Sequence, residues 1–157
     1  MGFHLAPEIE EGVTIYANDE RRQEWRIALD ELNEVAAERG RSLPEVSISW
    51  RDEQATLTRG CEGEWTLDKA QMDPLFVRYR DSIRRVSRVC ASGRAGADEI
   101  RRLDDRKRQA HNGGAEGLMA LLTDQIPLDE DTARRLFSLL FLLWDHGLGP
   151  EVRLHHR

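Results

Sequence analysis

The chain has few residues that could cross-link it and no long apolar run. Its 157 residues include two cysteines and five prolines. Cys61 and Cys90 lie far apart without a CxxC partner, so we expect two free thiols in a reducing cytoplasm, with a single bridge as the alternative. The longest apolar stretch, residues 139–144, is far shorter than the about 20 residues that span a bilayer. No signal region follows the start, so we expect a cytoplasmic protein without a membrane segment.

Strong positive charge and cofactor motifs are also missing. The net charge is −6 and the pI is about 5.4. This balance makes nucleic acid an unlikely partner, because phosphate contacts need a basic face. No P-loop, GxSxG, HExxH or GxGxxG occurs, and no ligand set has zinc spacing, so neither a cofactor nor a metal is expected.

Length and composition favour one soluble domain with a charged surface. Apolar residues make up 39% and charged residues 33% of the chain, and 157 residues can bury a self-sufficient core. We expect a single globular domain over residues 1–147 and a flexible tail over 148–157.

The N-terminal half predicts one helix and a small sheet. A short edge strand is expected at residues 13–16, and apolar residues recur every three or four positions over 20–39, which is typical of an amphipathic helix. Residues 46–50 and 55–59 alternate apolar and polar side chains around a polar turn, and 65–67 adds a third strand. The sheet is expected to be antiparallel with two or three strands.

The C-terminal half predicts the remaining helices. Asp73 and Pro74 are expected to begin a helix that continues to about residue 91, where Gly93 stops it. Further helices are expected over 98–112, 115–122 and from 129–131 to 146. The last is apolar almost all round, which indicates a central buried helix or one shared with a partner. The predicted fold class is α+β, with four to five α-helices packed on the sheet.

One face of the helix over 98–112 brings polar side chains toward the core. With residues about 100° apart, Lys107 lies inside the inward arc, and Asp104 and His111 lie at its margin. Such groups must pair, reach water or line a cavity, because burying unpaired charge is costly. In a cavity, His111 could transfer a proton near neutral pH. The alternative is a structural histidine bonded to nearby backbone, with Lys107 extended to solvent.

The glycine pair after this helix offers a second hint. Gly113 and Gly114 are expected to break the helix and to leave N–H groups that bind an anion at the next helix start. Glu116, just inside that helix, could then orient His111. The alternative is that the glycines only separate two helices.

The last helix begins with acids and carries two adjacent arginines. Asp129 or Asp131 is expected to cap it. Arg134 and Arg135 point about 100° apart, so we expect that they cannot both face one groove. One would form a surface ion pair, and the other would bind a carboxylate or phosphate.

Two stretches of the C-terminal half resemble a known family. Residues 107–116 read KRQAHNGGAE and residues 129–137 read DEDTARRLF. The chain resembles a family of short uncharacterised bacterial proteins with Arg-Arg-x-x-His-Asn-Glu-Gly-(Ser/Ala)-Glu followed by Asp-x-Asp-Thr-Ala-Arg-Arg-Leu-Phe. Lys107 and Gly113 depart from the first motif, and residues 144–147 depart from the His-Trp-Arg-Gly that tends to end the family's last helix. The resemblance implies a shared fold and site but no reaction, since no activity is assigned to the family.

These features together predict a small cofactor-independent enzyme that acts by acid/base chemistry on a polar anionic metabolite. His111 would be the general acid or base, oriented by Glu116 or Asp104. The predicted substrate-binding residues are Asn112, Arg134, Lys107 and Arg108. One alternative is a non-catalytic homodimeric interaction or regulatory protein that docks on a partner enzyme through the final apolar helix. Another is a nucleic-acid-associated regulator that uses the arginine-rich strings.

Overall fold

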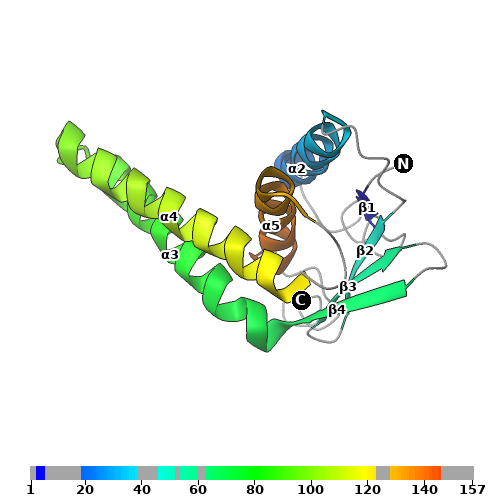
Figure 1. The fold of residues 1–157 in the computed structure, drawn as a ribbon. Helices are drawn as coiled ribbons and strands as arrows, with labels where there is room; N and C mark the ends of the chain where they lie inside the picture. Colours follow the sequence, from blue (N-terminus) through cyan, green and yellow to red (C-terminus); the bar gives the residue numbers. More distant parts are fainter. Residues whose placement is uncertain are drawn as a thin grey trace, which may run out of the picture.

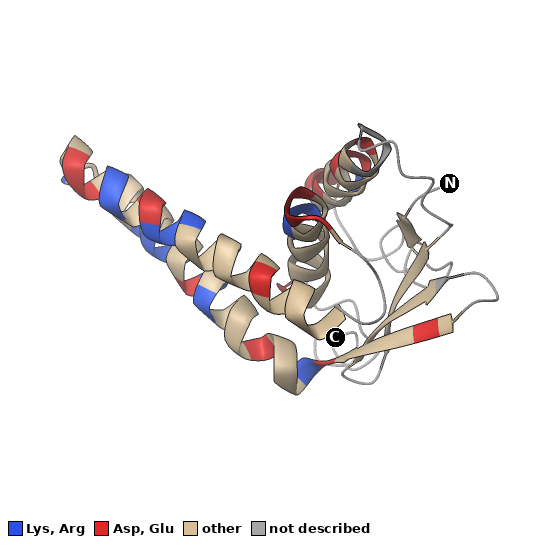
Figure 2. Cartoon of the chain, viewed as in Figure 1, with Lys and Arg blue, Asp and Glu red and all other residues tan. Residues whose placement is uncertain are grey.

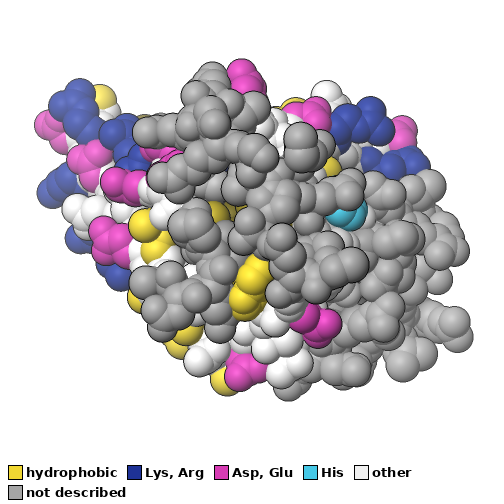
Figure 3. Space-filling view, turned by 45° about the vertical axis from the view of Figure 1, so that its right-hand side comes forward, with side chains coloured by type: hydrophobic (Ala, Val, Ile, Leu, Met, Phe, Trp, Pro, Cys, Tyr) yellow, Lys and Arg dark blue, Asp and Glu magenta, His cyan; other side chains and the backbone are white. Residues whose placement is uncertain are grey.

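The protein combines a small sheet with four helices in its described part. The computed structural model describes residues 3–5, 19–38, 46–51, 54–59, 63–122 and 128–145. Its elements, in order, are β1 Phe3–Leu5, α2 Asp19–Glu38, β2 Val46–Arg51, β3 Gln54–Arg59, β4 Gly63–Asp68, α3 Lys69–Ser92, α4 Ala97–Leu122 and α5 Glu130–Asp145. In Figure 1, α3 and α4 form a long hairpin that projects away from the sheet, while α5 and α2 lie beside its base. Charged side chains gather at its projecting end (Figure 3).

The described sheet has four strands, where two or three were expected, and it is mixed. Its order is β1-β2-β3-β4. The antiparallel pairs β2–β3 and β3–β4 confirm the predicted hairpin and third strand. The purely antiparallel expectation is wrong, because β1 pairs with β2 in parallel. A strand of three residues is too short to show a convincing alternation. The strand expected at 13–16 lies outside the described residues.

A side chain of α2 holds β1 at the sheet edge. The Phe3 N–H donates to Asn33 Oδ1 at 2.7 Å, and Asn33 Nδ2 donates to the Phe3 carbonyl at 3.0 Å. Phe3 and Leu5 are buried, as are Trp25 and Leu32 of α2. The polar clamp and the apolar packing together fix α2 against this part of the sheet.

Helix α5 is the central buried helix. Leu136, Phe137, Leu139 and Leu140 are completely buried, which confirms the prediction from its apolar sequence. Asp129 caps the helix, because its Oδ1 accepts the Thr132 N–H at 2.7 Å. Both α4 and α2 contact α5, and its two arginines, Arg134 and Arg135, are partly buried and exposed respectively.

Helix α3 begins earlier than predicted. It starts at Lys69 rather than at Asp73, and Pro74 lies inside it. Met72, in the first turn, is 1% exposed, so packing rather than a cap at Asp73 fixes this end. The Asp73 carboxylate instead accepts a hydrogen bond from Trp144 Nε1 at 2.8 Å. Gly93 ends the helix as expected, with a left-handed φ of 66°.

Helix α4 is continuous across the glycines that were expected to break it. It spans Ala97–Leu122 without interruption. A Cβ added at Gly114 would lie 2.2 Å from the Phe137 ring, and one at Gly117 would lie 2.6 Å from Leu75 Cδ1. These glycines allow α4 to approach its neighbours closely. The predicted anion-binding turn before Ala115 is wrong, since its N–H groups lie inside a helix.

Candidate functional site

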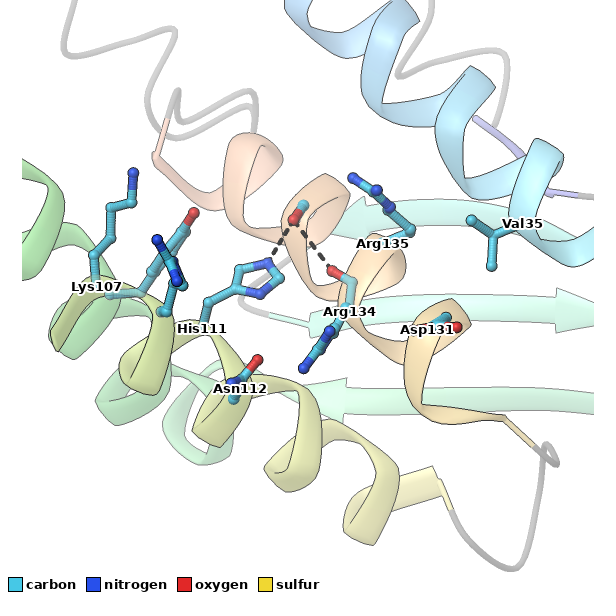
Figure 4. A pocket seen from close by; sticks show the side chains of 10 residues that line it. Val35, Lys107, His111, Asn112, Asp131, Arg134 and Arg135 are labelled. Carbon is cyan, nitrogen blue, oxygen red and sulfur yellow. Dashed lines mark hydrogen bonds between the residues drawn. The ribbon is translucent and has the colours of Figure 1, made fainter. Parts of the chain in front are cut away.

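An open pocket forms where α4 faces α5, with α2 and α3 at its edges. Its volume is about 620 Å³. Figure 4 shows His111 and Lys107 reaching in from α4 and the two arginines extending from α5. The lining consists of Val35, Tyr79, Lys107, Arg108, His111, Asn112, Asp131, Arg134, Arg135 and Ser138. The structure therefore brings together five of the seven predicted site residues.

His111 lies between aromatic rings and a hydroxyl group. Its ring centroid is 5.1 Å from that of Tyr79 and 5.5 Å from that of Phe137. Nε2 lies 2.7 Å from Ser138 Oγ, whose hydroxyl donates to the Arg134 carbonyl at 3.1 Å. Because that donation uses the only hydroxyl hydrogen, Nε2–H donates to Oγ and Nδ1 keeps its lone pair. A neutral His111 with an accepting Nδ1 fits this network.

The pocket disfavours a positive charge on His111. Burial lowers the pKa of His111 below its ordinary value of 6.5, and the charges of Arg134, Arg135 and Lys107 lower that pKa further. Burial also raises the pKa of the neighbouring Tyr79 hydroxyl. His111 is thus neutral at pH 7 in a positive local potential, which is the state of a proton acceptor.

Four basic side chains in the lining form ion pairs at the pocket rim. The N–O distances are 3.6 Å for Lys107–Asp104, 2.9 Å for Arg108–Asp104, 3.5 Å for Arg134–Glu130 and 2.8 Å for Arg135–Glu31. All of these partners are at least a third exposed, so each pair contributes only about 0–1 kcal/mol. A ligand could replace such partners at little cost.

Both adjacent arginines line the pocket, so the expectation that they could not share a groove is wrong. Arg135 reaches Glu31 of α2, and Arg134 lies toward α4 beside Asn112 (Figure 4). The pocket extends around one side of α5, and side chains about 100° apart both reach it. Arg134 Nε is buried and has no hydrogen-bond partner. It is a donor that a bound anion could use.

Neither predicted orienting acid reaches His111. Glu116 is exposed and lies outside the pocket lining. Asp104 is occupied by Arg108 and Lys107; its hydrogen bond with Arg108 is the main reason that the pKa of Asp104 is lowered. Ser138 contacts His111 instead. Sequence reasoning missed it, although its position four residues after Arg134 places both on one helix face.

Within the described ranges, no group of three or more His, Cys, Asp and Glu side chains is placed to hold a metal ion. The helices of those ranges include none that is long and apolar enough to cross a membrane. Cys90 is an exposed free thiol; Cys61 and the predicted tail lie outside the described residues.

The fold and pocket define a small mixed α/β protein with a histidine in a basic pocket, and comparison with known sequences assigns its family. The chain belongs to the Uncharacterised protein family (UPF0262), whose sequence model matches residues 6–145. A UPF0262 protein of Novosphingobium aromaticivorans is 32% identical, covering 89% of this chain and 94% of the relative. One of Sphingopyxis alaskensis is 29% identical, covering 91% and 93%. No solved structure matches the chain.

Proposed function

We propose that the pocket binds a small anionic metabolite and that His111 exchanges a proton with it. The supporting observation is that Lys107, Arg134 and Arg135 line one open pocket with His111; burial, and then these three charges, lower the His111 pKa. A pocket lined by several cations raises the local concentration of anions. Phosphate or carboxylate oxygens fit this chemistry, because guanidinium groups can bind them through two parallel hydrogen bonds.

The arginines can reach a ligand without a large rearrangement. Arg134 already has an unused buried Nε–H, and its contact with Glu130 is long at 3.5 Å. An anion that accepts from Nε would satisfy this donor. Asn112 adds an uncharged amide to the lining, and Asp131 adds one acid. This mixture favours a polar anion with a donor group over a simple halide.

Ligand binding and the protonation of His111 are coupled in this arrangement. An anion between the cations removes much of the positive potential that lowers the His111 pKa. The neutral ring of the empty pocket would accept a proton from the bound molecule, and the anionic complex would stabilise the resulting imidazolium. This is the requirement for a general base that becomes a general acid in the same cycle. We propose an acid/base enzyme on this ground.

Binding can be tested with simple anions. Inorganic phosphate and citrate would be titrated into the protein while NMR follows the His111 ring protons across pH. We expect saturable binding and a rise in the His111 pKa. Arg134→Gln should weaken binding at least ~10-fold, since a charged hydrogen bond is worth about 1.5–3 kcal/mol. Arg102→Gln is the control, because Arg102 is exposed and lies outside the pocket lining. Absence of binding at millimolar anion, or an unchanged His111 pKa, contradicts the proposal.

Catalysis needs a separate measurement. Once binding has identified a substrate, His111→Gln should lower kcat about 10²–10⁴-fold with a small change in KM. Ser138→Ala tests whether the hydrogen bond at Nε2 positions the ring, and it should shift the pH profile of kcat. Full turnover by the glutamine variant would show that His111 is not the acid or base of the reaction.

The alternative of a homodimer through the final apolar helix has less support. Leu139 is completely buried and Phe141 is 6% exposed within a single chain. Leu142 is partly buried against the same core. The apolar side chains on which that prediction relied are therefore used internally, and docking of a partner enzyme through α5 stays a prediction.

A further inference from the structure

A second cavity runs along the projecting hairpin, away from the His111 pocket. It lies between α3 and α4 and has a volume of about 1060 Å³. Its floor includes Val89, Leu103 and Ala110; the last two are 8% and 3% exposed. Four arginines line it: Arg78, Arg85, Arg88 and Arg106. We call this cavity the hairpin groove.

The arginines of the hairpin groove have no acidic partner in the described chain. None of the four forms an ion pair there, and Asp81, the acid in the same lining, lies 3.7 Å from Arg80 Nε. Residues 69–94 hold seven basic residues and two acids in a chain whose net charge is −6. Figure 2 shows the positions of basic residues, in blue, along the hairpin with acidic positions, in red, between them. The hairpin groove is therefore complementary to an acidic surface with some apolar character.

The outer face of α2 is such a surface. Glu20, Asp30 and Glu34 are exposed there, opposite the buried Trp25–Leu32 side. Ile27 lies among them at 49% exposure, and it is the only exposed large hydrophobic side chain in the described ranges. An acidic helix with a central apolar residue matches a basic groove with an apolar floor.

We propose that a second copy of this chain places the outer face of its α2 in the hairpin groove, and that the exchange is reciprocal. Reciprocal contacts give a closed two-fold dimer in which each copy donates one α2 and accepts one. The lengths agree: at about 1.5 Å per residue, the groove lining from Arg78 to Ser92 spans about 21 Å, as does α2 from Glu20 to Glu34. Two such contacts per dimer increase the buried area beyond that of a single helix in a groove.

Nucleic acid is a poorer occupant of the hairpin groove. No aromatic side chain lines the groove, whereas single strands are bound by stacking on aromatic rings. The overall charge of −6 also repels a polyanion. Binding of α2 from a second copy requires neither aromatic rings in the groove nor a positive net charge on the protein.

Charge reversal in both partners tests this dimer. One variant carries Arg85→Glu and Arg88→Glu; the other carries Glu20→Lys, Asp30→Lys and Glu34→Lys. Wild-type protein should sediment as a dimer of two 18.1 kDa chains at low salt and dissociate as salt screens the contacts. Each variant alone should lose at least ~100-fold in dimer affinity, because like charges then face each other in both contacts.

The mixture of the two variants is the decisive sample. In the mixed dimer, one contact joins glutamates to lysines and the other joins the native arginines to the native acids, so dimerisation should return. Arg94→Glu with Arg102→Glu is the matched control outside the groove lining, and it should leave the dimer intact. Circular dichroism checks that every variant is folded. A wild-type monomer at 100 µM and low salt, a dimer unaffected by both variants, failure of the mixture to reassociate, or a monomer that binds nucleic acid through Arg85 and Arg88 would each overturn the proposal.

Discussion

Two neighbouring glycines inside α4 should respond to alanine in opposite directions. A Cβ at Gly113 would have one close neighbour, Arg78 Nη1 at 3.6 Å, which is an ordinary contact. A Cβ at Gly114 would lie 2.2–2.4 Å from three carbons of the Phe137 ring, and that ring is completely buried. The two positions share helix, sequence context and chemistry, and they differ only in what the new methyl group meets.

The expected magnitudes follow from helix propensity and overpacking. Alanine in place of glycine inside a helix stabilises by up to ~1 kcal/mol, so Gly113→Ala should stabilise by about 0.5–1 kcal/mol. At Gly114 the same gain is opposed by an overlap that forces the ring or the helix to move. Overpacking typically costs about 1–3 kcal/mol, and an overlap of this depth belongs at the upper end or beyond. Gly114→Ala should therefore destabilise by at least ~2 kcal/mol.

Thermal and urea unfolding measure both effects. In a domain of this size each kcal/mol shifts Tm by about 2–4 °C, so Gly113→Ala should raise Tm slightly and Gly114→Ala should lower it by about 4–8 °C. Phe137→Leu removes the ring that the new methyl group at Gly114 would overlap. It should therefore destabilise the Gly114→Ala variant less than it destabilises the native protein. If both alanines act alike, or if both destabilise strongly, the continuous helix packed on Phe137 is refuted.

Two further predictions concern the loss of stability in acid and the N-terminal cap of α5. Burial and the nearby cations lower the pKa of His111 in the folded protein. Below a pH of about 6.5 the unfolded chain therefore binds a proton more readily than the folded chain does. The free energy of unfolding should keep its full value above that pH and decrease below it. His111→Gln should reduce the decrease in the free energy of unfolding between pH 7 and pH 5, measured by urea unfolding. A pH profile equal to that of the native protein would show that the His111 pKa is not lowered. Asp129→Ala should cost about 0.5–2 kcal/mol, while Asp129→Asn keeps most of the stability, since either side-chain oxygen can accept the Thr132 N–H. Equal losses in both variants would exclude the cap.

Elements with a repeated apolar pattern could be predicted from the sequence. The last helix was recognisable because acids that can cap a helix precede a segment that is apolar almost all round. The sheet hairpin was recognisable because side chains alternate on both sides of a polar turn. Strand β1 could not be recognised. Its pairing depends on β2, more than 40 residues away in the register Phe3 to Val46, and on the clamp by Asn33.

Glycine and proline were misread because tertiary contacts decided their role. Gly114 looks like a helix breaker in a sequence that gives no sign of Phe137 facing it. Asp73 and Pro74 look like a helix start, but the helix already begins one turn earlier at Lys69, and Met72 within that turn is buried. Helix propensity is a small energy that tertiary packing can override. Here the partners, Phe137 for Gly114 and Trp144 for Asp73, both belong to α5, far along the chain.

The candidate site was predicted in part for a similar reason. The helical period of α4 correctly grouped Lys107 with His111, because both lie on one helix. The orienting role of Glu116 depended on a turn that does not exist. Ser138, which does contact His111, required knowledge of which face of α5 meets α4.

The core residues of α5 and its pocket-lining residues lie on different faces of the helix, so the pocket can be mutated without changing the core. Leu136, Phe137 and Leu140 are completely buried, whereas Arg134 and Ser138, one turn apart, line the pocket. The residues that match the family pattern thus serve two purposes on one helix. Substitutions at Arg134 or Ser138 remove polar atoms from a partly exposed face, so they should change ligand binding and the His111 pKa with little loss of stability. A variant at Phe137 would disturb the core, the Gly114 contact and the His111 ring together, and its effect on function could not be interpreted. The polar face of α5 is therefore the place where the proposed chemistry can be tested apart from the fold.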